Sequence, residues 1–279
     1  MGTFVTPAAT DSALFATLVL SGGALSQNGI IRVTGLLDWS GTTTLNGTGT
    51  TRVPAGGTLT ISGAGTRTLV SGTLENGGTT ATWADAAFVN TGLGAVIRNL
   101  AAGSFTFTGS GTFSYNQGGL APLFDNQGTL TVNNGGATFT MNAPFNNSNT
   151  VTVTSGDLNL QSGGTQSGTT NITAGAFVSF NGGTHSFVAG HSAAGAGVTR
   201  LLAGSLTTAS PTDSARFQNL TLTAGSLVQA GVIRVNGTLD WSGTTNLTGG
   251  GVTRVGSAGI LNMTGTGTLS LNTTTNRPI

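Results

Sequence analysis

Short stretches in which apolar and polar residues alternate recur along this chain about every 20 residues. The segment 124–141 (FDNQGTLTVNNGGATFTM) is followed 21 residues later by 145–160 (FNNSNTVTVTSGDLNL), and 169–183 repeats the order of strand, glycine turn and strand. Such alternation is typical of strands that bury one face, and pairs such as Asn134-Gly135 suit corners where φ is positive. Because a repeat this short cannot bury its apolar face alone, successive repeats must stack, which predicts an all-β solenoid of roughly 14 coils.

A second, longer repeat relates the two ends of the chain. With an offset of 202 residues, 24 of the 41 positions in 29–69 are identical to those in 231–271. We therefore treat 11–71 and 213–273 as equivalent segments of one super-repeat, within a single solenoid over 1–279. The period is poor between 84 and 123, where we expect a bulged or looped-out coil. Positions expected to face the core keep the same residue in both copies: Ile31, Val33, Leu37, Trp39, Leu45, Val53, Leu59 and Leu69.

Few residues carry charge, which narrows the classes of function. Charged residues make up 6% of the chain, against roughly 25% in an ordinary globular domain, so hydroxyl and amide groups must form most of the surface. The 37% apolar content and the net charge of +1 argue against disorder. The absence of Cys and Lys excludes disulfides, thiolate metal sites, Schiff-base chemistry and P-loop phosphate binding. Nine scattered Arg predict no basic stripe and no nucleic-acid partner, and no apolar run is long enough for a membrane span.

The segments 37–53 (LDWSGTTTLNGTGTTRV), 145–164 (FNNSNTVTVTSGDLNLQSGG) and 174–187 (AGAFVSFNGGTHSF) resemble repeats of very large bacterial surface proteins. Those Gly/Thr/Asn-rich repeats are similar in style to filamentous haemagglutinin and autotransporter passenger stalks. The resemblance covers nearly the whole chain. It implies a right-handed parallel β-solenoid (β-helix) with roughly 20-residue coils, in an extracellular or cell-surface protein used for adhesion or envelope structure. It brings no catalytic residues with it, and we expect a segment of a longer protein or a subunit whose ends stack.

One short motif suggests a nucleophile, and two histidines suggest a metal. Residues 190–194 (GHSAA) nearly match the G-x-S-x-G elbow of hydrolases, but that class needs a later His and none follows His191. We interpret the motif as a turn between coils.

A metal site at His185 and His191 would need more donors, and the nearest carboxylates in sequence are Asp157 and Asp213. We expect both histidines at surface or corner positions.

Paired carboxylates would be needed for a polysaccharide-degrading enzyme, since β-helices host such enzymes. The chain has one Glu, Glu75, and seven Asp, of which Asp125 and Asp157 are the residues whose replacement would test such an activity. Four other Asp form two pairs related by the super-repeat, which indicates a structural role: Asp11 with Asp213, and Asp38 with Asp240. We expect surface ion pairs worth at most about 1 kcal/mol each, between Asp38 and Arg32 and between Asp240 and Arg234.

Trp39 and Trp241 occupy equivalent positions and could stack on sugars if they were exposed. Each alternates onto the same side of its strand as the Leu two residues before it, so we expect both in the core. The Thr of TLTIS, TVTVT and LTLTAG are expected to point outward, an arrangement that ice-binding solenoids use. Because coil length varies and Asn, Ser and Ala interrupt the rows, we interpret these Thr as general strand formers.

We predict no catalytic, cofactor-binding or metal-binding residue, no cofactor and no enzymatic activity. The leading hypothesis is a structural stalk or fibre segment of an extracellular bacterial surface protein, able to associate with copies of itself through exposed terminal coils. The first alternative is a glycan-binding or ice-binding adhesin module, with surface glycans as partners. The second alternative is a polysaccharide-degrading β-helix enzyme.

Overall fold

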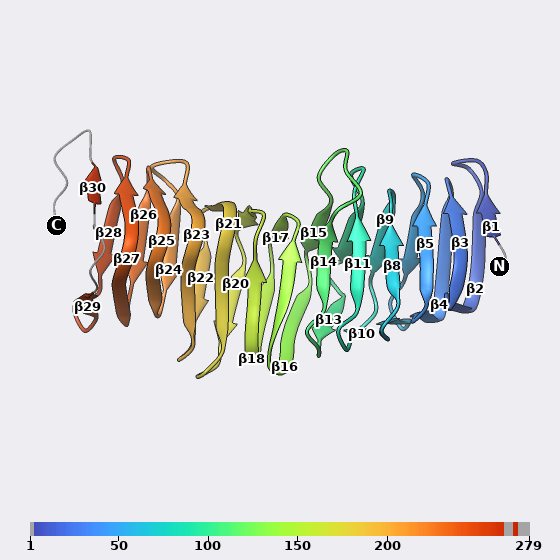
Figure 1. Ribbon diagram of the computed structural model, residues 1–279, viewed down its shortest axis with the longest axis horizontal. Coiled ribbons are helices and arrows are strands. Elements are labelled where there is room, and N and C mark those ends of the chain that lie inside the picture. The colour runs from blue at the N-terminus through green and yellow to red at the C-terminus, as the bar shows by residue number, and fades with distance from the viewer. Residues whose placement is uncertain (1–2, 265–269, 273–279) are drawn as a thin grey trace.

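A computed structural model of the protein describes residues 3–264 and 270–272 (Figure 1). Within these residues there are 30 strands and no helix, and the strands pair in parallel. Figure 1 shows the strands lying across the long axis of an elongated molecule, with β1 near one end and β29 near the other. The prediction of an all-β, parallel β-solenoid is therefore confirmed. Of the segment 213–273, residues 265–269 and 273 lie outside the described part.

Three faces run the length of the solenoid, and each coil crosses them in the order A, B, C. Several strands bend at a corner and contribute to two faces. Face A contains β1 (Thr3–Thr6), β3 (Gly22–Gln27), β5 (Thr42–Asn46), β8 (Thr66–Leu69), β11 (Phe88–Thr91), β14 (Thr112–Tyr115), the second parts of β16 (Thr129–Asn142) and β18 (Thr150–Leu160), the first parts of β21 (Phe177–Phe187), β23 (Val198–Thr208), β25 (Leu220–Gln229) and β27 (Thr238–Thr248), and β29 (Ile260–Met263). Face B contains the first parts of β2 (Ser12–Val19) and β4 (Ile30–Trp39), β6 (Thr50–Val53), β9 (Thr73–Asn76), β12 (Val96–Asn99), β15 (Leu123–Asn126), β17 (Phe145–Asn147), β19 (Gly164–Gln166), the second parts of β21, β23, β25 and β27, and β30 (Ser270–Asn272). Face C contains the second parts of β2 and β4, β7 (Thr58–Ile61), β10 (Thr80–Trp83), β13 (Ser104–Phe107), the first parts of β16 and β18, β20 (Thr169–Ile172), β22 (His191–Ala194), β24 (Ser214–Phe217), β26 (Val232–Val235) and β28 (Val252–Val255).

Coil length varies more than the sequence period suggests. Paired residues are separated by as few as 18 positions, from Ser214 to Val232, and by as many as 28, from Thr112 to Thr140. The long coils surround the loop 116–122, which rises above the neighbouring corners in Figure 1. The strands of the segment 84–123 stack in register, so the irregularity expected there is a bulge at one corner and not a looped-out coil. Face A has 13 described strands, so the chain makes about twelve turns and not 14, because many of its coils exceed 20 residues.

The interior is filled by every second residue of each strand, as alternation predicts. In the long middle coils these residues are aromatic: the rings of Phe107 and Phe139 stack 3.9 Å apart, and Trp83 contacts both edge-on. The Nε1 atom of Trp83 donates to the carbonyl of Ala87 at 2.9 Å, so its polar atom is satisfied. Large rings thus fill the wider interior that a longer coil encloses.

The two copies of the super-repeat keep the same stacking neighbours but lie on different faces of the solenoid. Arg32 lies on face B, stacked between Leu14 and Arg52. Its counterpart Arg234 is stacked between the counterparts of the same two neighbours, yet it lies on face C. The 202-residue offset therefore corresponds to a whole number of turns plus one face, and the second copy is wound onto the next side of the solenoid.

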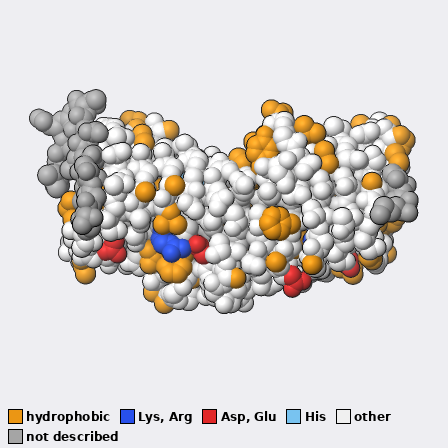
Figure 2. All heavy atoms as spheres, in the orientation of Figure 1, with side chains coloured by type: hydrophobic (Ala, Val, Ile, Leu, Met, Phe, Trp, Pro, Cys, Tyr) orange, Lys and Arg blue, Asp and Glu red, His pale blue; other side chains and the backbone are white. Residues whose placement is uncertain are grey.

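Uncharged groups dominate the surface, as the composition requires. The face shown in Figure 2 is mostly backbone and neutral polar side chains, with few charged groups, and one basic patch lies close to an acidic one. The few charges are therefore informative, because each occupies a defined position on a specific coil.

Candidate functional site

Four charged side chains of alternating sign stack on successive coils of face B. Arg52, Glu75, Arg98 and Asp125 occupy in-register positions of β6, β9, β12 and β15. Glu75 binds Arg52 at 2.5 Å and Arg98 at 3.2 Å, and Asp125 binds Arg98 at 2.9 Å. The hydrogen bond that Arg98 donates to Asp125 raises the pKa of the guanidinium. We call this array the charge ladder; it ties four coils together and leaves each carboxylate neutralised.

A further ion pair lies on face A and joins strands that are two coils apart, β18 and β23. Arg200 donates to Asp157 Oδ2 at 2.8 Å and to Ser179 Oγ at 3.0 Å, and Ser179 Oγ in turn donates to Asp157. The guanidinium of Arg200 also lies 3.9 Å from the ring centroid of Phe177. Burial raises the pKa of Asp157, although the serine and the arginine oppose that shift.

The structure does not bring the two candidate catalytic carboxylates together. Asp125 lies on face B and Asp157 on face A, and each is bound to an arginine. A glycoside hydrolase needs two carboxyl groups that flank one bond. These two carboxylates therefore do not form that arrangement.

The expected ion pairs between Arg32 and Asp38 and between Arg234 and Asp240 are wrong. The chain turns a corner near Gly35, so the two residues lie on different faces. Arg32 lies on face B and Asp38 on face C. The equivalent corner separates the second pair, and Asp240 Oδ1 instead accepts a hydrogen bond from the side chain of Asn262 at 2.7 Å. Alternation along a sequence shows which residues point outward, but it does not show on which face they do so.

Surface or corner positions were expected for His185 and His191; the surface is wrong, since they are only 0% and 3% exposed, but each residue lies just after a corner of the chain. The ring of His185 packs against Phe180 and its Nε2 lies 3.0 Å from the carbonyl of Gly182, whereas His191 packs against Phe187. Both occupy inward positions where aromatic rings line the coil. Burial lowers the pKa of each to about 4, so both are neutral at pH 7. No group of three or more metal-ligating side chains occurs in the described residues.

The segment 190–194 forms a turn only at its start. Gly190 has a φ of 101° and ends the turn, whereas His191–Ala194 is strand β22. Successive residues of a strand point to opposite sides, so His191 faces the interior while Ser192 faces outward. The two side chains therefore cannot act as base and nucleophile.

The predicted core positions of Trp39 and Trp241 are confirmed. Their exposed fractions are 0% and 4%. Neither Nε1 atom has a hydrogen-bond partner in the described part of the chain. A ring enclosed in this way fills the solenoid and is not available to stack on a sugar.

Sequence reasoning missed a buried ladder of asparagines at the corner that follows face B. Asn76, Asn99, Asn126 and Asn147 are the last residues of β9, β12, β15 and β17. Each Nδ2 donates to Oδ1 of the next asparagine, at 2.9, 2.9 and 2.8 Å. Their signal in the sequence is an apolar residue, any residue and then Asn at a strand end: LEN, IRN, FDN and FNN. Unequal spacing of 23, 27 and 21 residues hid this pattern.

Arg67 was also missed, although it alternates onto the same side of its strand as the buried Leu69, because an arginine is rarely fully buried. Its side chain is fully enclosed and donates to the carbonyls of Trp39 at 2.7 Å, Ser40 at 2.8 Å and Gly65 at 2.5 Å. Burial lowers the pKa of this guanidinium, although nearby carboxylates oppose the shift. The residue joins two adjacent coils at a corner by satisfying their carbonyl groups.

Comparisons with protein families, curated proteins and solved structures find no match to this chain. The described residues also contain no helix long and apolar enough to cross a membrane.

Proposed function

We propose that this chain is a structural stalk or fibre segment of an extracellular bacterial surface protein. The observation that carries the proposal is the asparagine ladder, in which Asn76, Asn99, Asn126 and Asn147 bond one coil to the next inside the solenoid. The charge ladder does the same on face B. The polar and charged side chains of these two ladders are directed toward neighbouring coils, whereas an enzyme would direct such groups toward a substrate. The surface location and the right-handed winding rest on the resemblance and stay predictions.

Such an architecture can keep a rod at a fixed length. Twelve turns at the spacing of parallel strands give a rod of about 58 Å. Because neighbouring coils share a continuous ladder of backbone hydrogen bonds, few peptide groups are available to a protease. The loop 116–122 is the clearest exception, since six of its seven residues are exposed.

At each end of the described part of the chain, side chains in core positions are partly exposed. Phe4 stacks over Leu25 in the inward row of face A and is 41% exposed. At the other end Leu261 and Met263 continue the inward rows of Leu239 and Trp241 and are 48% and 55% exposed. Stacking of one end on another solenoid end would bury these side chains and pair the open strand edges, which supports end-to-end association.

Negative-stain electron microscopy over a concentration series tests this proposal, combined with limited proteolysis. We expect discrete rods about 58 Å long at low concentration, filaments one coil wide at high concentration, and first cleavage within 116–122. A Leu261→Asp/Met263→Asp variant should keep the rods and lose the filaments. Globular particles, or early cleavage spread over many coils, would contradict the stalk.

Rows of hydroxyl groups on face C favour ice binding as a second candidate function. Outward residues on consecutive coils form two rows in register: Thr58, Thr80, Ser104, Thr129, Thr150 and Thr169, and beside them Thr60, Thr82, Thr106, Thr131 and Thr152. The sequence suggested that Asn, Ser and Ala interrupt such rows, yet the second row is an unbroken run of five Thr between Asp38 and Asn171. A flat, rigid lattice of hydroxyls, with about 4.8 Å between strands and 6.6 Å along a strand, can order water.

Ice recrystallisation inhibition separates this function from the stalk. We expect the wild-type protein to inhibit recrystallisation and a Thr106→Lys/Thr131→Lys variant on face C to lose that activity. A Thr68→Lys variant, which carries the same change on face A, is the control and should remain active. Equal loss in both variants, or no activity in the wild type, would exclude ice binding and leave the stalk proposal intact.

A further inference from the structure

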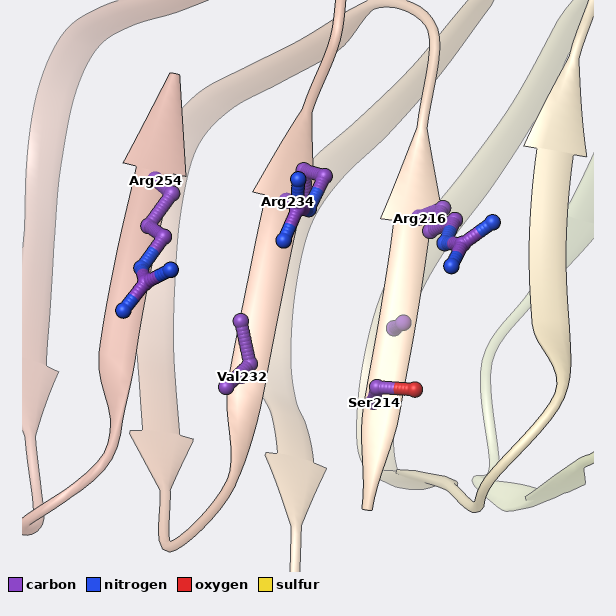
Figure 3. A pocket seen from close by; sticks show the side chains of 6 residues that line it. Ser214, Arg216, Val232, Arg234 and Arg254 are labelled. Carbon is purple, nitrogen blue, oxygen red and sulfur yellow. The ribbon is translucent and has the colours of Figure 1, made fainter. Parts of the chain in front are cut away.

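Three arginines on face C form a row that the sequence did not reveal. Arg216, Arg234 and Arg254 occupy in-register positions of the adjacent strands β24, β26 and β28, and all three are exposed. Figure 3 shows their side chains on three neighbouring strands, with Val232 and Ser214 further along the same strands. The expectation that the nine arginines are scattered, with no basic stripe, is wrong for these three. We call them the arginine row.

The arginine row has no counter-charge in the described part of the chain. None of the three side chains takes part in an ion pair or a hydrogen bond there, whereas Arg52, Arg98 and Arg200 are each bound to a carboxylate. Adjacent like charges on paired strands repel each other. A chain with so few charges therefore carries a destabilising arrangement on three successive coils, which is typical of a site that binds an anion.

The super-repeat allows the arginine row to be compared with the corresponding row of the first copy. In the first copy the corresponding row begins with Leu14, continues through Arg32 and Arg52, and ends at Glu75, which binds Arg52. In the second copy Arg216 replaces the leucine. The two copies thus share a fold but differ in charge, and only the second presents three unneutralised guanidinium groups.

A shallow groove accompanies the arginine row. One hollow of about 180 Å³ is lined by the three arginines together with Ser214, Ala215 and Val232. A second, of about 240 Å³, continues past Ser214 and Arg216 to Ser192 on the preceding coil. Neither lining includes a carboxylate or a Phe, Tyr or Trp side chain, while two serines supply hydroxyl groups.

We infer that the arginine row binds a linear acidic polysaccharide. Guanidinium groups bind carboxylate or sulfate oxygens in a bidentate way, and the row offers one such group per coil along the solenoid axis. Successive groups are spaced by about 4.8 Å, the strand spacing, which is comparable to the advance per unit of an extended sugar chain. The serines can bond sugar hydroxyls. Single-stranded nucleic acid is disfavoured, because its bases need aromatic platforms that the groove does not offer.

Calorimetric titration with polygalacturonate tests this inference, with neutral dextran, inorganic sulfate and oligo-dT as comparison ligands. We expect the Arg216→Gln/Arg234→Gln/Arg254→Gln variant to bind polygalacturonate at least about tenfold more weakly than the wild type. Its melting temperature should be unchanged or higher, because a repulsion is removed. Wild-type affinity should also fall with added salt, and this dependence should weaken in the variant.

The matched control is Arg32→Gln, the same change at the equivalent position of the first copy. Binding should weaken in Arg234→Gln and stay at the wild-type level in Arg32→Gln. Unchanged binding in the triple variant, or equal loss in Arg32→Gln, would overturn the inference. So would tighter binding of oligo-dT, equal binding of dextran, or an affinity for sulfate alone that matches the polymer, which would leave an isolated anion site.

Discussion

Asn99 donates a hydrogen bond from Nδ2 to Oδ1 of Asn126 at 2.9 Å, across 27 residues of sequence. The same Nδ2 lies 3.0 Å from the carbonyl of Thr129, and Asn99 Oδ1 accepts from Asn76. Because an Asn side chain offers both a donor and an acceptor, identical residues can stack without limit and each satisfies the next. The asparagine ladder is thus a polar spine that fixes which coils are neighbours.

Breaking this ladder at its centre should destabilise the solenoid. In Asn99→Ala, Asn76 loses the nearest of its three acceptors and Asn126 loses its donor, both in the interior, which should cost about 1–3 kcal/mol. Urea unfolding followed by circular dichroism measures the loss, and hydrogen exchange should show it concentrated in the neighbouring coils. The exposed Asn171→Ala is the control, expected to change stability by less than about 0.5 kcal/mol. Equal effects in both variants would contradict a special role for the ladder.

Removing the negative charge at the centre of the charge ladder should destabilise the solenoid, because two arginines are then left with no carboxylate between them to offset their repulsion. In Glu75→Gln, Arg52 and Arg98 lose the carboxylate between them, and we expect a loss of about 1–2 kcal/mol that shrinks at high salt. Asp240→Asn is the matched control, because Asp240 is bonded only to the neutral Asn262 among its described contacts. Thermal unfolding at low and at high salt measures both variants. A loss for Glu75→Gln that does not depend on salt would show that packing, not charge, holds these coils.

Stability should fall in mild acid because two histidines are buried in neutral form. Their folded pKa of about 4 lies below the unfolded value of 6.5, so the unfolded chain takes up protons first as the pH falls. The stabilisation is complete above pH 6.5 and is lost progressively down to about pH 4, by about 3 kcal/mol for each histidine. Urea midpoints between pH 7.5 and 4.5 measure this dependence. In the His185→Leu/His191→Leu variant the profile over that range should be much flatter, and an equally steep profile would assign it to other groups.

Close approach of coils at corners should make certain glycines irreplaceable. A Cβ atom at Gly243 would lie 1.5 Å from the carbonyl oxygen of Thr223 on the preceding coil, so Gly243→Ala must displace backbone. We expect a loss of about 1–3 kcal/mol in urea unfolding. Gly22→Ala is the control, since a Cβ there meets nothing within 4 Å and should be tolerated. If the two variants are equally stable, the corners are looser than the structure indicates.

The sequence by itself determined the class of fold and the side of each strand that is buried. Strict alternation placed Trp39 and Trp241 in the core, and it placed the threonines of TLTIS outside, because successive residues of a strand must point in opposite directions. The 20-residue period required stacked coils, since no single repeat can bury its apolar face. The poor period between 84 and 123 indicated an irregular coil, and the structure has the long loop 116–122 at one of its corners.

Only the tertiary structure decided which residues become vertical neighbours. Which residues stack depends on the lengths of the corners. These lengths vary, so paired residues are 18 to 28 positions apart, and local sequence propensities do not determine the total length of a coil. For this reason the asparagine ladder and the arginine row were invisible in sequence, and the expected pairing of Arg32 with Asp38 was wrong because a corner separates them. Alternation is a local consequence of backbone geometry, whereas stacking is a consequence of the whole winding of the chain, and the chemistry of this surface is set by the stacking.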